Sequence, residues 1–155
     1  MIQRIQTLYL LGIVVLTTLM MCLPLAYFVG GEETFNLYGY GLRSVATGEM
    51  YKSTIFLMII LGLAALLPVV NIFLYKRRMA QIRYCIVEFV LLVGSVIMLA
   101  VHYFLFYRAF ADFDFHAQGM KVTMLLPIAA LFLNYLAIKA IVADEMLVRS
   151  LDRIR

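Results

Sequence analysis

The chain has 155 residues, of which 65% are hydrophobic and only 14% are charged, and its formal net charge is +4. This composition excludes an ordinary soluble domain and indicates a membrane protein. The basic excess does not indicate nucleic-acid binding, because the Lys and Arg residues gather beside long apolar segments, where they orient membrane spans.

Four apolar segments of 22 to 24 residues follow one another, at 8–29, 54–75, 84–107 and 122–143. A helix rises about 1.5 Å per residue, so each segment could cross a hydrocarbon core of about 30 Å. Lipid offers no hydrogen-bond partner to the backbone, so each span must be helical. The connections are too short to bury cores of their own, since even marginal soluble domains need about 40 residues. We therefore expect one all-α membrane domain over 1–155, a four-transmembrane-helix bundle whose tail, 144–155, continues the fourth helix.

The ends of the chain and the connection between the second and third spans hold nine of the thirteen basic residues. Lys and Arg are retained on the cytoplasmic side of membrane spans, so both termini should face the cytoplasm. A basic cluster in the connection is expected to contact the anionic headgroups of the bilayer. It consists of Lys76, Arg77, Arg78 and Arg83.

Two segments outside the spans have the alternation of short strands, at 34–42 and 112–116. In the second, the phenylalanines would face one side and the two aspartates with His116 the other. We expect short β-like segments over the outer helix ends. The D-x-D-x-H pattern would bind a divalent cation only with further ligands. Solvated loop acids are the preferred interpretation, and no metal site is predicted.

The third span carries Glu88, Ser95 and His102, whose spacing of seven places them on one polar stripe of the helix. Ionisable groups inside a bilayer are costly and often mark ion pathways, so Glu88 and His102 could be the ends of a proton path. The alternative is structural and is preferred. Counted from the predicted span ends, Asn71, Glu88 and Lys139 form a polar layer one turn below the cytoplasmic surface. A Glu88–Lys139 ion pair assisted by Asn71 would neutralise the buried charge.

The fourth span has a face of small residues around one amide, formed by Ala130, Asn134 and Ala137. Small side chains let helices approach closely, and an amide can bond across the interface for about 1 kcal/mol. This face is interpreted as a helix-packing surface, with a buried substrate site as the alternative.

Several kinds of chemistry have no support in the sequence. No Walker loop, G-x-S-x-G nucleophile or H-E-x-x-H metal motif is present, and the two histidines lie at different depths, which argues against haem ligation. Cys22 and Cys85 are expected at opposite sides of the membrane, beyond the limit of about 7 Å between the Cα atoms of a disulfide. We predict no catalytic residue and no cofactor, and an enzyme is not favoured.

The two ends of the chain, MIQRIQTLYLL at 1–11 and DEMLVRSLDRIR at 144–155, flank the four predicted spans. With those spans, they resemble a family of small inner-membrane proteins of the Bacteroidota classed as a domain of unknown function. The resemblance implies a location in the cytoplasmic membrane and terminal motifs that meet at its inner face. It carries over no activity and no catalytic residue.

Two other classes share the four spans but lack matching residues. Claudin-like proteins have a strand-bearing first outer loop, but their signature requires tryptophan and paired cysteines, and this chain has no Trp and no cysteine in its outer segments. Small multidrug exporters have a membrane glutamate in the first helix, whereas Glu88 lies in the third. Both analogies concern architecture alone.

The favoured hypothesis is a non-enzymatic accessory or scaffold protein that assembles with a membrane-protein partner or with copies of itself. The rival hypothesis is a small proton-coupled or ion-coupled transporter that uses Glu88. A third, with less support, is a membrane enzyme acting on a lipid or quinone.

Overall fold

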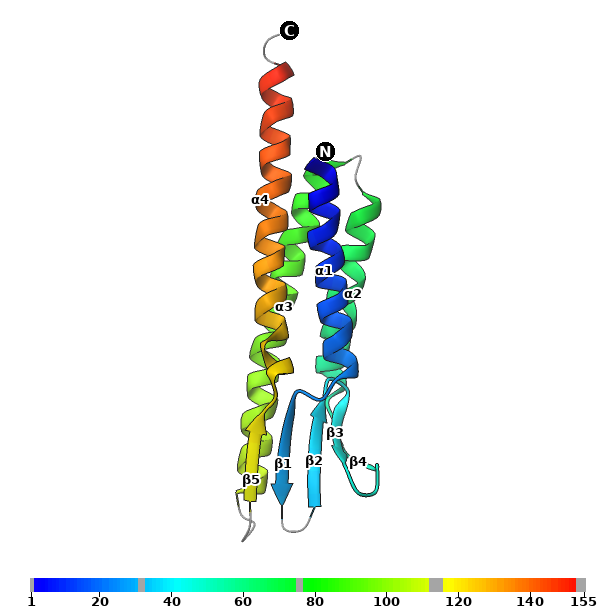
Figure 1. Ribbon diagram of the computed structural model, residues 1–155, viewed down its shortest axis with the longest axis vertical. Coiled ribbons are helices and arrows are strands. Elements are labelled where there is room, and N and C mark those ends of the chain that lie inside the picture. Colours follow the sequence, from blue (N-terminus) through cyan, green and yellow to red (C-terminus); the bar gives the residue numbers. More distant parts are fainter. Residues whose placement is uncertain (1, 31–32, 75–76, 112–115, 153–155) are drawn as a thin grey trace.

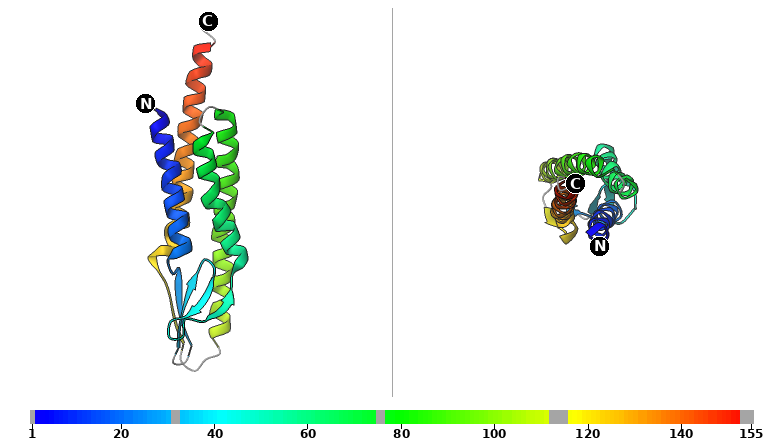
Figure 2. Two further views of the ribbon diagram at one scale, coloured as in Figure 1. Left: turned by 90° about the vertical axis from the view of Figure 1, so that its right-hand side faces the viewer. Right: turned by 90° about the horizontal axis from the view of Figure 1, so that it is seen from above.

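The computed structural model describes residues 2–30, 33–74, 77–111 and 116–152. Four long helices stand side by side and alternate in direction (Figure 1). They are α1 (Ile2–Cys22), α2 (Ile55–Phe73), α3 (Arg78–Phe110) and α4 (Leu126–Asp152). Each helix packs on the next and α4 closes onto α1, so the bundle is a ring of four (Figure 2). All four are long and apolar enough to cross a membrane, which confirms the predicted bundle.

A small antiparallel sheet covers one end of the bundle. Four strands come from the connection between α1 and α2, and the fifth comes from the connection between α3 and α4. They are β1 (Ala26–Gly30), β2 (Glu33–Tyr38), β3 (Gly41–Ser44), β4 (Met50–Ser53) and β5 (His116–Met120), in the spatial order β4-β3-β2-β1-β5. We call this the sheet end and the opposite end, where both termini lie, the terminal end (Figure 1).

The first predicted span, 8–29, is wrong in its last part. Helix α1 ends at Cys22, and Ala26–Gly30 forms β1 in the middle of the sheet. Pro24 lacks the N–H needed to continue the helix. The strand that follows is apolar but alternates in burial, with Ala26 and Phe28 fully buried. Pairing with β2 on one side and β5 on the other favours the extended conformation there.

The other helices also differ from the predicted spans at their ends. Helix α3 begins at Arg78, six residues before the predicted start, and continues to Phe110. A short 3-10 turn, η1 (Val122–Leu125), precedes α4, so Pro127 lies in the first turn of that helix, where its missing N–H needs no partner. Helix α4 runs on to Asp152, as expected for the tail.

The predicted strand at 34–42 is a hairpin, β2 and β3, rather than one strand. Gly41 begins β3 where the neighbouring strand approaches closely, since a Cβ there would lie 2.7 Å from the Lys52 carbonyl oxygen. Of the second predicted strand, 112–115 lies outside the described residues and His116 begins β5.

The inner face of the sheet packs on the part of α3 that extends past the other helices. Phe28 lies at the centre of this contact, with its ring centroid 5.3 Å from that of Tyr103, 6.1 Å from Phe106 and 5.8 Å from Phe110. Phe35 of β2 joins the cluster, 5.2 Å from Phe110. The long α3 and the sheet therefore share one aromatic core.

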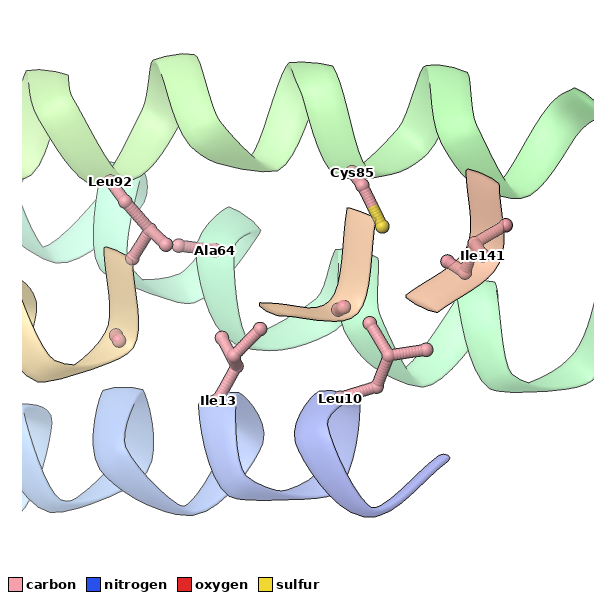
Figure 3. Packing of buried hydrophobic residues seen from close by; sticks show 8 residues of the cluster. Leu10, Ile13, Ala64, Cys85, Leu92 and Ile141 are labelled. Carbon is pink, nitrogen blue, oxygen red and sulfur yellow. The ribbon is translucent and has the colours of Figure 1, made fainter. Parts of the chain in front are cut away.

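A second core fills the interior of the bundle and draws on every helix. It consists of Leu10, Ile13, Ala64, Cys85, Leu92, Ala130, Ala137 and Ile141. Figure 3 shows Leu92 of α3 and Ala64 of α2 pointing toward one another, while the Cys85 sulfur points from α3 into the space between the helices. The alanines let the helices approach closely.

Candidate functional site

Five polar or sulfur-bearing residues gather inside the bundle in the half nearer the terminal end. Asn71 comes from α2, Gln81, Cys85 and Glu88 come from α3, and Asn134 comes from α4; all five are buried. We call this group the polar layer. Polar groups buried between membrane helices are costly unless they find partners, so their contacts decide what the layer can do.

The three residues of α3 belong to one continuous inward face. The buried positions along this face are Gln81, Cys85, Glu88, Leu92, Ser95 and Leu99. Steps of three and four residues keep side chains on the same side of an α-helix. Because α3 is already helical at Arg78, Gln81 lies on this face rather than in a connecting loop.

Asn71 and Gln81 tie the end of α2 to the start of α3. The Asn71 side-chain nitrogen donates to the Gln81 carbonyl oxygen at 3.3 Å, and the Gln81 side-chain nitrogen donates to the Asn71 carbonyl oxygen at 3.1 Å. The Asn71 nitrogen also lies 3.1 Å from the sulfur of Cys85. This reciprocal pair fixes how α2 and α3 meet.

Asn134 makes the corresponding link between α4 and α3. Its side-chain nitrogen donates to the Cys85 carbonyl oxygen at 3.0 Å. A carbonyl oxygen can only accept, so the NH₂ group of each asparagine, and not its oxygen, must face the backbone of α3. The orientations of the Asn71 and Asn134 amides are therefore fixed by their neighbours.

Four side-chain oxygens of the layer have no hydrogen-bond partner among the described residues. They are Asn71 Oδ1, Asn134 Oδ1 and both carboxyl oxygens of Glu88. An unsatisfied buried acceptor costs about 1–3 kcal/mol, and a charged one costs more. The layer thus has an excess of acceptors, and Glu88, which holds two of them, is only 2% exposed.

The expected ion pair between Glu88 and Lys139 is wrong. Lys139 is exposed on α4, and neither carboxyl oxygen of Glu88 has a partner. Asn134 of α4 lies beside Cys85 of α3, and the two helices run in opposite directions. From the level of that contact, Lys139 lies toward the terminal end and Glu88 lies toward the sheet end. Five residues on α4 and three on α3 amount to about 12 Å along the bundle. The predicted depths were counted from Tyr84, but α3 begins at Arg78.

The other members of the predicted polar stripe are satisfied within their own helix. Ser95 is fully buried and donates to the Leu92 carbonyl oxygen at 2.7 Å. His102 is half-buried, and its Nδ1 lies 2.8 Å from the Met98 carbonyl oxygen. Of the stripe Glu88, Ser95 and His102, only Glu88 has side-chain oxygens left without a partner, and no described contact links the three.

The remaining predicted residues lie in two places. Ala130 and Ala137 are fully buried in the bundle core, on the same helix as Asn134. In the basic cluster, Arg77 and Arg83 are exposed near the terminal end and Arg78 is the first residue of α3. Lys76 lies outside the described residues, and the contact of this cluster with anionic lipid stays a prediction.

Sequence reasoning missed Gln81 as a member of the layer and placed Asn134 in a different one. The spacing 81, 85 and 88 was a usable signal, because it continues the buried pattern of α3 toward the terminal end. Both cysteines are free, with Cys22 exposed and Cys85 buried. No cluster of three or more His, Cys, Asp or Glu residues that could hold a metal occurs in the part of the chain that is described.

Residues 2–154 match the sequence profile of a family described as "Domain of unknown function (DUF4293)". The chain belongs to this family. The match spans all four helices and the whole sheet of the DUF4293 protein, which confirms the resemblance seen in the two ends of the sequence. No curated protein matches the DUF4293 chain.

Proposed function

We propose that this DUF4293 protein is a non-enzymatic accessory or scaffold component of the bacterial cytoplasmic membrane. The observation that supports this function is the last part of α4, which projects past the other helices at the terminal end (Figures 1 and 2). The side-chain nitrogen of Gln6 donates to the Ala140 carbonyl oxygen at 3.2 Å. Helix α1 begins four residues before Gln6, so it reaches about the level of Asp144.

The projecting part of α4 carries apolar side chains away from the bundle. Met146 is 67% exposed, Leu147 is 53% exposed and Val148 is 37% exposed. Apolar side chains that are exposed together outside the core commonly mark a site of interaction. A helix of another membrane protein, or the same helix of a second copy, would cover it.

The distribution of basic residues supports the orientation in this proposal. Arg77 and Arg83 lie at the start of α3, Arg4 lies in the first turn of α1 and Lys139 lies in the part of α4 that follows Asn134, so all four are nearer the terminal end. Retention of Lys and Arg on the cytoplasmic side would place the projecting helix in the cytoplasm and the sheet outside.

Photocrosslinking in living cells tests the scaffold function. A benzophenone amino acid replaces Leu147 in one variant and Phe132, which is 62% exposed in the first part of α4, in the matched control. We expect a discrete protein adduct from position 147, lost when Met146 is changed to Asp, and only lipid adducts from position 132. If position 147 gives no protein adduct, and a chain shortened to residue 144 keeps the same native assembly mass, the scaffold function is wrong.

A second candidate function, proton- or ion-coupled transport, is favoured by the unpartnered carboxyl group of Glu88. The test compares ion flux into liposomes for the wild type, Glu88→Gln and the control Glu49→Gln, which alters an exposed carboxylate at the sheet end. Transport predicts that Glu88→Gln alone abolishes the flux while the protein stays folded. An absence of flux from the wild type at any ion gradient removes this candidate.

A further inference from the structure

We propose that the polar layer binds a monovalent cation of the Na⁺ type, held by the carboxyl group of Glu88 and the side-chain oxygens of Asn71 and Asn134. This site goes beyond a scaffold function and does not depend on it. The site uses Glu88, as the transport candidate does, but it requires only that the cation binds and not that the cation crosses the membrane.

The first argument is the imbalance between acceptors and donors. The four buried side-chain oxygens of the layer that lack partners are all acceptors. The two asparagines cannot correct the imbalance by turning over, because their oxygens would then face carbonyl oxygens of α3, which cannot donate. Whatever completes this layer must therefore bring positive charge or donor hydrogens to several oxygens at once.

The second argument is that the three residues converge on one point of α3. Asn71 reaches the sulfur of Cys85 from α2 at 3.1 Å, and Asn134 reaches its carbonyl oxygen from α4 at 3.0 Å. Glu88 follows Cys85 by three residues on the same buried face, about 4.5 Å along the helix. Three helices thus each place one of these oxygen-bearing residues within about one turn of Cys85.

The third argument concerns charge and ligand type. One carboxylate and two neutral amides carry a single negative charge, which one monovalent cation neutralises. A divalent cation would leave a net positive charge in a medium of low dielectric constant, where an uncompensated charge is very costly. Carboxylate and amide oxygens are hard ligands that suit cations of this kind. Lys139, the expected source of positive charge, lies about 12 Å away along the bundle.

A proton on Glu88 is the competing explanation. Protonation would remove the charge but would supply only one donor, so the oxygen of at least one asparagine would still lack a partner. A bound cation satisfies the carboxyl oxygens and both amides together. The two explanations differ in whether the site responds to sodium at constant pH.

Cys85 provides a reporter inside the site. In a Cys22→Ser protein it is the only cysteine left, so a maleimide reagent would report its accessibility alone. At fixed pH and ionic strength, with choline replacing sodium, we expect Na⁺ at ten times its Kd to slow alkylation about tenfold, since only the unbound form opens to the reagent. Thermal unfolding of the same protein should shift to higher temperature with sodium.

Two variants in the Cys22→Ser background locate the effect. Glu88→Gln keeps the volume of the side chain but removes its charge, and it should abolish the response to sodium. Ser95→Ala alters a buried group on the same face of α3 that is already satisfied by Leu92, and it should leave the response intact. Retention of ²²Na⁺ by the wild type, one ion per chain, gives a second measurement if Glu88→Gln does not fold.

Three results would overturn the cation site. Alkylation and thermal unfolding that respond to pH but to no alkali cation would show that Glu88 takes up a proton only. A sodium response that persists in Glu88→Gln would place the ion elsewhere. Slower alkylation in Ca²⁺ at concentrations where Na⁺ has no effect would exclude a monovalent site. None of these results depends on crosslinking at Leu147 or on flux, so this inference fails or stands separately from both candidate functions.

Discussion

The sheet end and the polar layer treat buried polar groups in opposite ways. At the sheet end, Lys121 Nζ donates to Asn36 Oδ1 at 3.1 Å, and the buried hydroxyl of Thr54 donates to the Gly39 carbonyl oxygen at 3.1 Å. In the polar layer, both oxygens of Glu88 and one from each asparagine have no described partner. Among the described residues, the buried side-chain oxygens and nitrogens without a partner therefore all belong to the polar layer and none to the sheet end. Natural sequences commonly depart from local consistency where they function.

This contrast predicts that substitutions at the sheet end destabilise the protein, while a substitution in the polar layer can stabilise it. Free energies of unfolding, measured in the same mixed micelles for all variants, would test the comparison from its largest effect to its smallest.

Phe28→Ala should have the largest effect. It removes the ring at the centre of the aromatic core shared by β1 and α3, and a change of this kind costs about 3–5 kcal/mol. Proteolysis of the strands should also become faster. Phe56→Ala is the matched control, because Phe56 is 66% exposed on α2 and should contribute little. Equal losses from the two variants would contradict a packed sheet end.

Gly119→Val should cost about 1–3 kcal/mol through overpacking. Gly119 of β5 is paired with Tyr27 of β1, and a Cβ atom at this glycine would collide with the Tyr27 ring. In Gly62→Ala a Cβ on α2 meets no other atom within 4 Å, so this control should be neutral or stabilising by up to about 1 kcal/mol. A neutral Gly119→Val would mean that the ring does not lie over the strand.

Glu88→Gln should stabilise the protein by about 1–2 kcal/mol in sodium-free buffer, where the unpaired carboxyl group of the wild type is replaced by a neutral amide of equal size. The measurement is repeated at high sodium, where the stability of Glu88→Gln relative to the wild type should fall to zero or below. A loss of stability in sodium-free buffer would indicate that Glu88 has a partner there.

Lys139→Met should have the smallest effect, within about 0.5 kcal/mol, because Lys139 is exposed and far from Glu88. A double-mutant cycle with Glu88→Gln should give additive free energies. Non-additive free energies would show that Glu88 and Lys139 interact, and would contradict their separation in the fold.

The sequence was sufficient to predict the bundle, because the length and hydropathy of a membrane span leave few alternatives. It was not sufficient for β1, since Ala26–Gly30 is apolar enough to extend a span and its pairing with His116–Met120 connects distant parts of the chain. Asn71, Glu88 and Asn134 were each recognised as candidates from their residue types. Their assembly was missed because a start of α3 placed at Tyr84 instead of Arg78 shifts every depth along that helix.

The position of β1 has a mechanical consequence. The strand is bonded to β2, which leads back to α2, and through five residue pairs to β5, which leads into α4. The hairpins α1–α2 and α3–α4 are therefore clamped together at the sheet end, where separation would break a β ladder. At the other end, α2 and α3 are joined by a short connection of the chain and by the Asn71–Gln81 pair. There α1 and α4 meet through side-chain bonds such as Gln6 to Ala140, which cost far less to break than a β ladder. Separation of α1 from α4 is therefore easier at the terminal end than at the sheet end.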